Sequence, residues 1–218
     1  MRIPTLAIAA VPCALSLLLG GQEQTSAEAR RINPGLAFRV VSADVARDGA
    51  ISVRYKVTDS TGLLLDVMGK QTPGAIAVRH QAGYVLRGQT HFLSYTTKPP
   101  PAGRNPSTLG AEDSGGTLTA VSSGEYIYTF HAKAPPGWDP AATHRIVVHG
   151  LRDLKPWGLG AKYADTTFDF VPAGGTPQAP EVYRHCNSCH GASQAAPDGS
   201  PRSEELCIMC HTQQKCAS

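Results

Sequence analysis

The sequence predicts an all-β immunoglobulin-like sandwich domain over residues 30–171, followed by a small, mostly irregular or short-helical tail over 181–218. Two observations support this fold class. Apolar and polar residues alternate strictly over 51–58, which is the period of a half-buried strand. Short segments of this kind recur between turns rich in glycine and proline, as in a sandwich, and no stretch keeps a helical period.

The expected strands lie between turn signals. Arg47-Asp-Gly49 precedes the alternating segment and Asp59-Ser-Thr-Gly62 follows it. In the strand expected at 125–130, Tyr126, Tyr128 and Phe130 stand at every second position and share a face. A segment rich in proline, glycine and serine, 98–116, predicts a long surface loop. In chain order, the strands are expected at 36–41, 51–57, 75–79, 91–96, 117–121, 125–130, 143–148 and 166–171.

The proline- and glycine-rich segment 172–180 predicts a linker between the sandwich and the tail. Cysteine is absent from residues 30–185, so the sandwich must be stabilised by a hydrophobic core, for which roughly 140 residues are ample. The tail has few apolar residues and cannot build a core by itself. It therefore needs apolar surface from another source.

Residues 1–29 predict a secretory signal peptide. Arg2 precedes an apolar stretch that ends at Leu19, and Ala27-Glu28-Ala29 supplies the small-residue cleavage site. The apolar run is short for a spanning helix and is broken by Pro12, although a retained membrane anchor is the alternative. We expect an exported protein, in the periplasm or on the outer cell surface, with no stable membrane span in the mature chain.

Two copies of a Cys-x-x-Cys-His motif occupy the tail, Cys186-Asn-Ser-Cys189-His190 and Cys207-Ile-Met-Cys210-His211. This pattern is the attachment signature of c-type haem. Two thiols form thioethers with the haem vinyl groups, and the following histidine lies beneath the iron as its proximal ligand. We therefore expect two covalently attached haem c groups, which would also supply the apolar surface that the tail lacks. The expected attachment residues are Cys186, Cys189, Cys207 and Cys210, and the expected proximal ligands are His190 and His211.

The same four cysteines also have the spacing of a zinc ribbon, C-x2-C-x17-C-x2-C, and could form two disulfides. The histidine after each pair favours haem. With 8 His among 218 residues, that coincidence arises on composition alone roughly once in a thousand sequences. Export favours haem as well. Cys216 has no expected partner and is interpreted as a free thiol or one half of an intermolecular disulfide.

The chain resembles the OmcA/MtrC family of multihaem, usually decahaem, outer-surface c-type cytochromes. The resemblance rests on phrases that follow in the family's order along most of the mature chain. They are DSGGTLT at 113–119, GEYIYTF at 124–130, WDPAATHR at 138–145, LRD at 151–153, TFDFVP at 167–172, CNSCH at 186–190 and ELCIMCH at 205–211. The resemblance implies β domains joined to multihaem domains that pass electrons to minerals, soluble metals, flavins or partner cytochromes.

Two departures from the family pattern matter. The family continues through further CxxCH motifs, whereas this chain stops seven residues after His211, which indicates a truncated product or a natural dihaem relative. Family members also carry a histidine between the first two motifs, and residues 191–206 contain none. The distal ligands must then come from elsewhere. His185 and His144 are the candidates, and His144 is otherwise a hydrogen-bonded structural residue; His80, His91 and His131 are expected at the surface.

The predicted function is electron transfer, with other cytochromes or an outer-membrane conduit as partners and a metal or flavin as acceptor. One alternative is an immunoglobulin-like docking module with a vestigial haem segment. Another is a haem enzyme that binds a small ligand at an open iron site. No catalytic triad or phosphate-binding loop indicates bond-breaking chemistry. The net charge of +3 at pH 7 is too small to indicate nucleic-acid binding.

Overall fold

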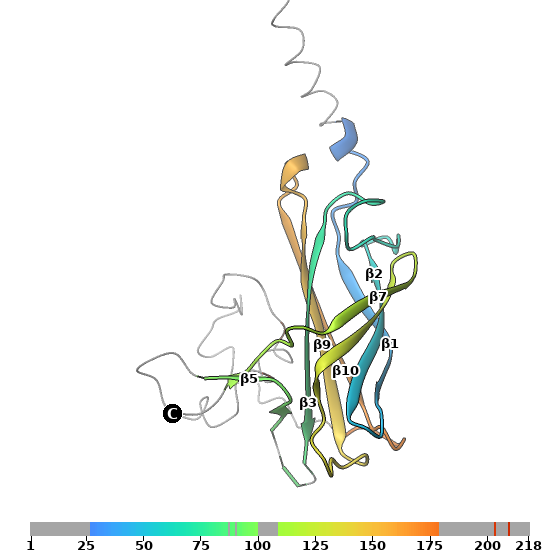
Figure 1. The fold of residues 1–218 in the computed structure, drawn as a ribbon. Helices are drawn as coiled ribbons and strands as arrows, with labels where there is room; N and C mark the ends of the chain where they lie inside the picture. Colours follow the sequence, from blue (N-terminus) through green and yellow to red (C-terminus); the bar gives the residue numbers. More distant parts are fainter. Residues whose placement is uncertain are drawn as a thin grey trace, which may run out of the picture.

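The computed structural model describes residues 27–86, 88–89, 91–99, 109–178, 203 and 209, and these residues form a β-sandwich (Figure 1). The first sheet has the order β1-β2-β8-β7, and the second has the order β10-β9-β3-β4. All neighbouring strands are antiparallel. The strands of the first sheet are β1 (Ala37–Val45), β2 (Ala50–Thr58), β8 (Glu125–Lys133) and β7 (Thr117–Ser122). Those of the second are β10 (Ala161–Phe170), β9 (Thr143–Asp153), β3 (Ile76–Val85) and β4 (Leu93–Ser94).

The strand order is that of an immunoglobulin-type sandwich. When the strands of the two sheets are lettered A, B, C, C′, D, E, F and G along the chain, the sheets read A-B-E-D and G-F-C-C′. A small hairpin of β5 (Thr97–Lys98) and β6 (Leu109–Gly110) is inserted between C′ and D and projects from the sandwich (Figure 1). A single 3-10 turn, η1 (Lys155–Trp157), stands in the connection from β9 to β10.

The core lies between the two sheets and follows from the alternation of the strands. In β2 every second side chain, from Ile51 to Val57, is buried. In β8 the aromatic residues Tyr126, Tyr128 and Phe130 are buried on the same face, as the sequence predicts. The second sheet contributes Ile146 and Val148 from β9 to the same cluster. Burying this many large side chains at roughly 1.5–3 kcal/mol each is what offsets the chain entropy of folding.

His80 corrects one sequence-based expectation. It was expected at the surface, yet its side chain in β3 is only 3% exposed. Its ring stacks on Tyr128 of the opposite sheet, with centroids 3.6 Å apart, and its Nε2 is 3.1 Å from the Tyr55 hydroxyl. A histidine can be buried at the centre of a sandwich when an aromatic face and a hydroxyl partner replace water. His131 is exposed as expected, and His91 is half-buried.

The expected strands are present but differ in length. β3 continues from the expected end at 79 to Val85, and β9 from 148 to Asp153. Part of the expected loop 98–116 is the second strand of the β5–β6 hairpin. Within the described part of the chain, no helix is long and apolar enough to cross a membrane.

Candidate cofactor-docking face

The predicted haem-attachment motifs fall outside the described residues except at one position. That position is Met209, which stands between the two cysteines of the second motif and directly precedes the second of them. The other residues of the prediction lie outside the described residues, and they are Cys186, Cys189, His190, Cys207, Cys210, His211 and His185.

The outer face of the second sheet is the surface that Met209 contacts. On β9 the even-numbered residues Ile146 and Val148 point into the core, so the odd-numbered residues point outward. These outward residues are nevertheless buried, and β9 is covered on both sides. We define the outer face by Thr143, Arg145, Val147 and His149, whose exposed fractions are 6%, 4%, 0% and 3%.

Met209 packs in a small apolar cluster on this outer face. Its partners are Val85 at the end of β3, Phe92 before β4 and Val147 of β9. The thioether also lies over Gly83, where an added Cβ would come within 2.7 Å of the Met209 Cε. A side chain at Gly83 would displace Met209, so the glycine leaves room for the methionine. The second CxxCH motif therefore touches the sandwich through a residue that is 2% exposed.

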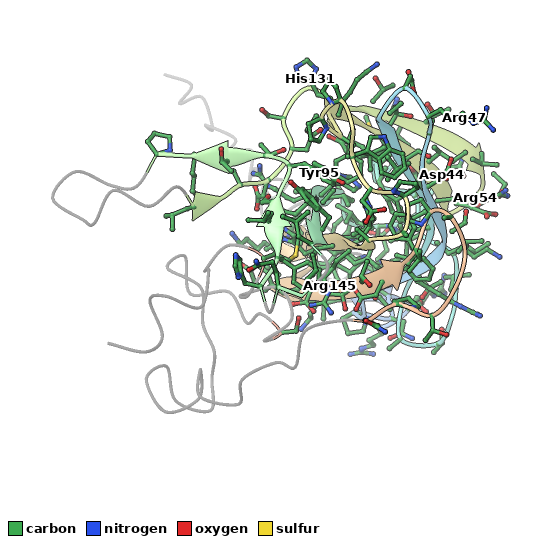
Figure 2. The ribbon with its side chains drawn as sticks, turned by 90° about the horizontal axis from the view of Figure 1, so that it is seen from below. Asp44, Arg47, Arg54, Tyr95, His131 and Arg145 are labelled. Atoms are coloured by element: carbon green, nitrogen blue, oxygen red, sulfur yellow. The ribbon has the colours of Figure 1, made fainter. Side chains whose placement is uncertain are left out.

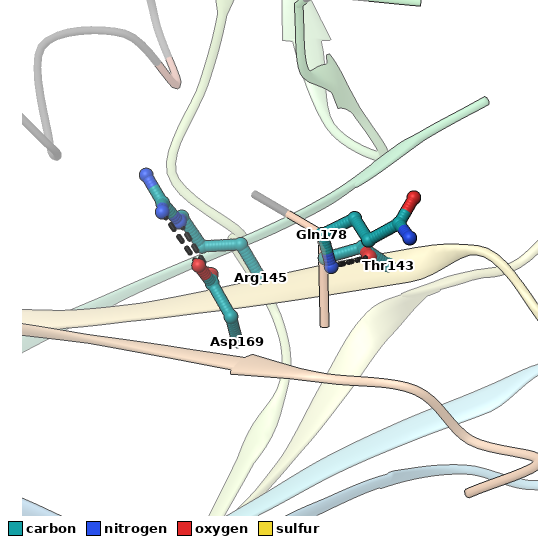
Figure 3. A network of polar contacts seen from close by, with 4 residues as sticks. All are labelled: Thr143, Arg145, Asp169 and Gln178. Carbon is teal, nitrogen blue, oxygen red and sulfur yellow. Dashed lines mark hydrogen bonds and ion pairs between the residues drawn. The ribbon is translucent and has the colours of Figure 1, made fainter. Parts of the chain in front are cut away.

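Two polar contacts join the C-terminal part of the chain to the same sheet. The backbone N–H of Gln178 donates to the Thr143 Oγ1 at 2.8 Å (Figure 3). The backbone N–H of Ser203 donates to the Asp165 Oδ2 on β10 at 2.8 Å. The described part of the expected linker is thus held against the outer face at Gln178.

Arg145 lies at the centre of the outer face and forms a two-pronged ion pair with Asp169 of β10. Its Nε and Nη2 donate to the two carboxylate oxygens at 2.6 and 2.7 Å. Its guanidinium carbon is 4.4 Å from the centroid of the Phe92 ring. Figure 3 shows the remaining nitrogen, Nη1, pointing away from Asp169. Among the described residues, this buried Nη1 has no hydrogen-bond partner.

The other end of the outer face carries a second charged group. Glu112, which follows β6, accepts from His149 Nε2 at 3.1 Å and from Arg79 Nη1 at 3.2 Å. Arg79 is paired with His149 across β3 and β9, so both donors rise from the same side of the sheet. These ion pairs hold the segment between β6 and β7 against the outer face.

His144, a predicted distal ligand, lies on the opposite face of β9 from Arg145. Its ring is enclosed by Tyr84, Tyr95, Trp138 and Phe170. Nδ1 is 3.0 Å from the Tyr95 hydroxyl, and Nε2 makes a longer 3.5 Å contact with the carbonyl oxygen of Asp139. Burial lowers the pKa of His144, partly offset by the Asp139 carbonyl. Both ring nitrogens therefore have partners inside the sandwich.

We expect His144→Ala to lower the free energy of unfolding by about 2–3 kcal/mol, because it leaves a cavity and an unpartnered Tyr95 hydroxyl. The optical spectrum of the haem-loaded protein should not change. His131→Ala, at an exposed position, is the control and should alter neither quantity. A gain of high-spin ferric haem, or of carbon monoxide binding, in His144→Ala would instead make His144 a distal ligand.

The residues of the outer face fit a haem in composition. Val85, Phe92, Val147 and Met209 are apolar, as the surroundings of a macrocycle must be, and the buried N–H of Arg145 has no partner among the described residues, as a propionate requires. The sequence does not mark Arg145 or Met209 as site residues. The one available signal is an arginine directly before the apolar residues 146–148 of β9, a strand that also contains Arg152. Within the described residues, no group of three or more His, Cys, Asp or Glu could hold a metal ion.

Comparison with known proteins places the fold among the β domains of outer-membrane cytochromes. The outer membrane decaheme cytochrome OmcA matches with a TM-score of 0.57 and 20% identity, over 84% of this chain and 30% of that chain. MtrC from Shewanella baltica OS185 matches with a TM-score of 0.51 and 20% identity, over 83% and 30%. This chain thus spans about 30% of their length. No family model and no curated protein matches it. At this identity the likeness shows the fold alone.

Proposed function

We propose that this chain is an exported c-type cytochrome that carries electrons through two covalently attached haems. The observation that carries the proposal is the pair of CxxCH motifs following a sandwich that shares the fold of OmcA and MtrC. When bound, each haem supplies an iron that cycles between Fe(III) and Fe(II). OmcA is named as an outer-membrane decaheme cytochrome, which supports electron transfer as the role of the shared architecture.

In this proposal the residues of the tail attach and ligate the cofactors. Cys186, Cys189, Cys207 and Cys210 form the thioethers, and His190 and His211 are the proximal ligands. His185 is the remaining distal candidate from the tail, since the nitrogens of His144 are engaged in the sandwich. The sandwich domain, 30–171, acts as the scaffold for the haem-binding segment, which packs on it at Met209.

The proposal also includes a cellular location and partners. Residues 1–29 have the pattern of a secretory signal, which supports the periplasm or the outer cell surface. Another cytochrome or an outer-membrane conduit would exchange electrons with the haems, and a metal or flavin would be the terminal acceptor. The fold shared with the outer-membrane cytochrome OmcA supports this assignment.

Cofactor content is the direct test. Expressed with a cytochrome maturation system, the protein should gain about two haem masses that survive denaturation, because thioethers are covalent. Cys207→Ala with Cys210→Ala should remove one haem, and Cys186→Ala with Cys189→Ala should remove the other. Mass spectrometry and a haem stain measure both. Cys216→Ala is the matched control and should keep two haems.

A colourless protein that holds zinc through the same cysteines would reject the proposal. A protein that carries one haem in the parent chain would restrict it to one motif. Reduction by dithionite, followed in the visible spectrum, then shows whether the attached haems accept electrons.

A further inference from the structure

We propose that Arg145 donates the N–H of its Nη1 to a propionate carboxylate of the haem attached at Cys207 and Cys210. This inference rests on the proposed function, because it requires that haem. It adds a cofactor-binding residue from the sandwich to a site otherwise built from the tail. The outer face of the second sheet then becomes one wall of the haem environment.

Arg145 is a buried cation whose hydrogen-bond donors are only partly used by the described residues. Arg145 is 4% exposed, and Asp169 takes the N–H groups of Nε and Nη2. Among the residues that the structure describes, Nη1 has no partner although it is buried. A buried guanidinium N–H without an acceptor costs free energy, and a carboxylate is its strongest partner. Asp169 already binds the edge of the guanidinium formed by Nε and Nη2. A second carboxylate must therefore approach from the side of Nη1.

The second CxxCH motif and Arg145 are close to each other through Met209. Met209 directly precedes Cys210, and consecutive Cα atoms are about 3.8 Å apart. Met209 packs in one apolar cluster with Val147, which lies two residues from Arg145 on the same face of β9, about 7 Å along the strand. A haem joined to Cys210 must therefore lie close to this part of the outer face.

The residues around Met209 match the two kinds of surface on a haem. The macrocycle is apolar, and Val85, Phe92 and Val147 are apolar. The propionates are anionic, and Arg145 is the cation next to these residues, with its guanidinium over the Phe92 ring. The Oγ of Ser203 is a second buried polar atom without a partner among the described residues, and its backbone is held to the same sheet through Asp165. The unfilled donors are thus on the side of the sandwich that receives the second motif.

The rival interpretation is that Arg145 serves only to pair with Asp169 and holds β9 to β10. The two interpretations differ in what happens when both charges are removed together. Arg145→Met combined with Asp169→Leu deletes one positive and one negative charge, so a purely structural ion pair predicts little change at the haems. Replacing both partners by apolar groups is also often tolerated by the fold.

The experiment is a spectroelectrochemical titration of the mature, haem-loaded chain. If Arg145 binds a propionate, the double variant should shift one of the two haem components to lower potential and leave the other unchanged. The propionate then keeps its full negative charge, which favours Fe(III). The propionate bending band in the resonance Raman spectrum should shift for one haem as well. Arg145→Lys keeps a cation beside Asp169 but lacks the second nitrogen, so the Raman band should shift in this variant too, whereas the potential should change less than in the double variant.

The control is Arg54→Met with Glu125→Leu, which removes an ion pair of 2.8 Å from the first sheet. Figure 2 labels Arg54 on the other side of the sandwich from Arg145, and both potentials should stay unchanged. Two attached haems with unaltered potentials and Raman bands in both Arg145 variants would overturn the inference. A parent chain without attached haem would instead refute the proposed function, so the two failures are distinguishable.

Discussion

Arg152→Met is expected to lower the free energy of unfolding by about 3–5 kcal/mol. The Arg152 side chain lies in β9 and is 2% exposed. Its Nε and Nη2 donate to the carbonyl of Pro73 at 3.0 and 2.7 Å, and its Nη1 donates to the carbonyls of Asn33 and Gly35, both at 2.9 Å. Methionine keeps the apolar stem but removes every donor, which leaves three carbonyls without these partners.

The pKa of Arg152 explains why the contacts matter. Burial lowers this pKa, and the Asp59 carboxylate offsets the shift in part. The charge is therefore tolerated because backbone carbonyls replace water around it. Through these contacts one side chain secures both the segment before β1 and the loop before β3 to the second sheet.

Equilibrium denaturation by urea, followed by tryptophan fluorescence, measures the effect. Arg39→Met on the exposed side of β1 is the matched control and should change the free energy of unfolding by less than about 0.5 kcal/mol. A loss below about 1 kcal/mol for Arg152→Met would mean that water satisfies the carbonyls after the substitution. The role assigned to Arg152 would then be wrong.

Strands with one solvent-exposed face could be predicted from the sequence. For strands that are covered on both faces, the ends could not be predicted. β2 and β8 alternate cleanly, so their positions and buried faces are those expected. In β9 the run from His144 to Gly150 is buried on both sides, which removes the alternation that marks a strand end. β3 continues past the expected end at 79 through His80 and Gln81, two polar residues that are nevertheless buried, each 3% exposed.

The candidate site likewise has one part that the sequence predicts and one part that it does not. The cysteines and histidines of the haem motifs are recognisable from spacing alone, because two thiols and a ligand must follow in one turn of chain. The outer face is not recognisable, because Met209 and Val147 are brought together only by folding. Within the described residues the Nη1 of Arg145 has no partner because Asp169 in a neighbouring strand takes Nε and Nη2, an arrangement that has no signature in the sequence.

The sandwich is expected to lose stability in acid well before its carboxylates titrate. The pKa of His80 is lowered to about 3, first by burial and then by His149, while Asp113 and Glu112 oppose the shift. In the unfolded chain the pKa of this histidine is near its ordinary value of 6.5. Below that pH the unfolded state binds a proton that the folded state does not, so stability present above pH 6.5 is lost as the pH falls toward 3. The loss between pH 7 and pH 4 should be about 3 kcal/mol.

His144 acts in the same direction, since burial also lowers its pKa. The carboxylates of Asp59 and Asp66 act in a lower window. Burial raises their pKa values, but hydrogen bonds from their own turns outweigh it, so both values fall below 3.8. Their contribution is lost only below about pH 4, which separates the two effects.

The free energy of unfolding, measured by urea denaturation at intervals from pH 7 to pH 4, tests this expectation. His80→Phe preserves a ring against Tyr128 and removes the titrating group, so its stability should depend much less on pH over this interval, whatever its value at pH 7. His131→Phe, at an exposed position, should keep the slope of the parent protein. Replacing the neutral histidine between Tyr55 and Tyr128 must remove its contribution to the pH dependence of the free energy of unfolding. An unchanged slope in His80→Phe would therefore show that the acid sensitivity arises elsewhere.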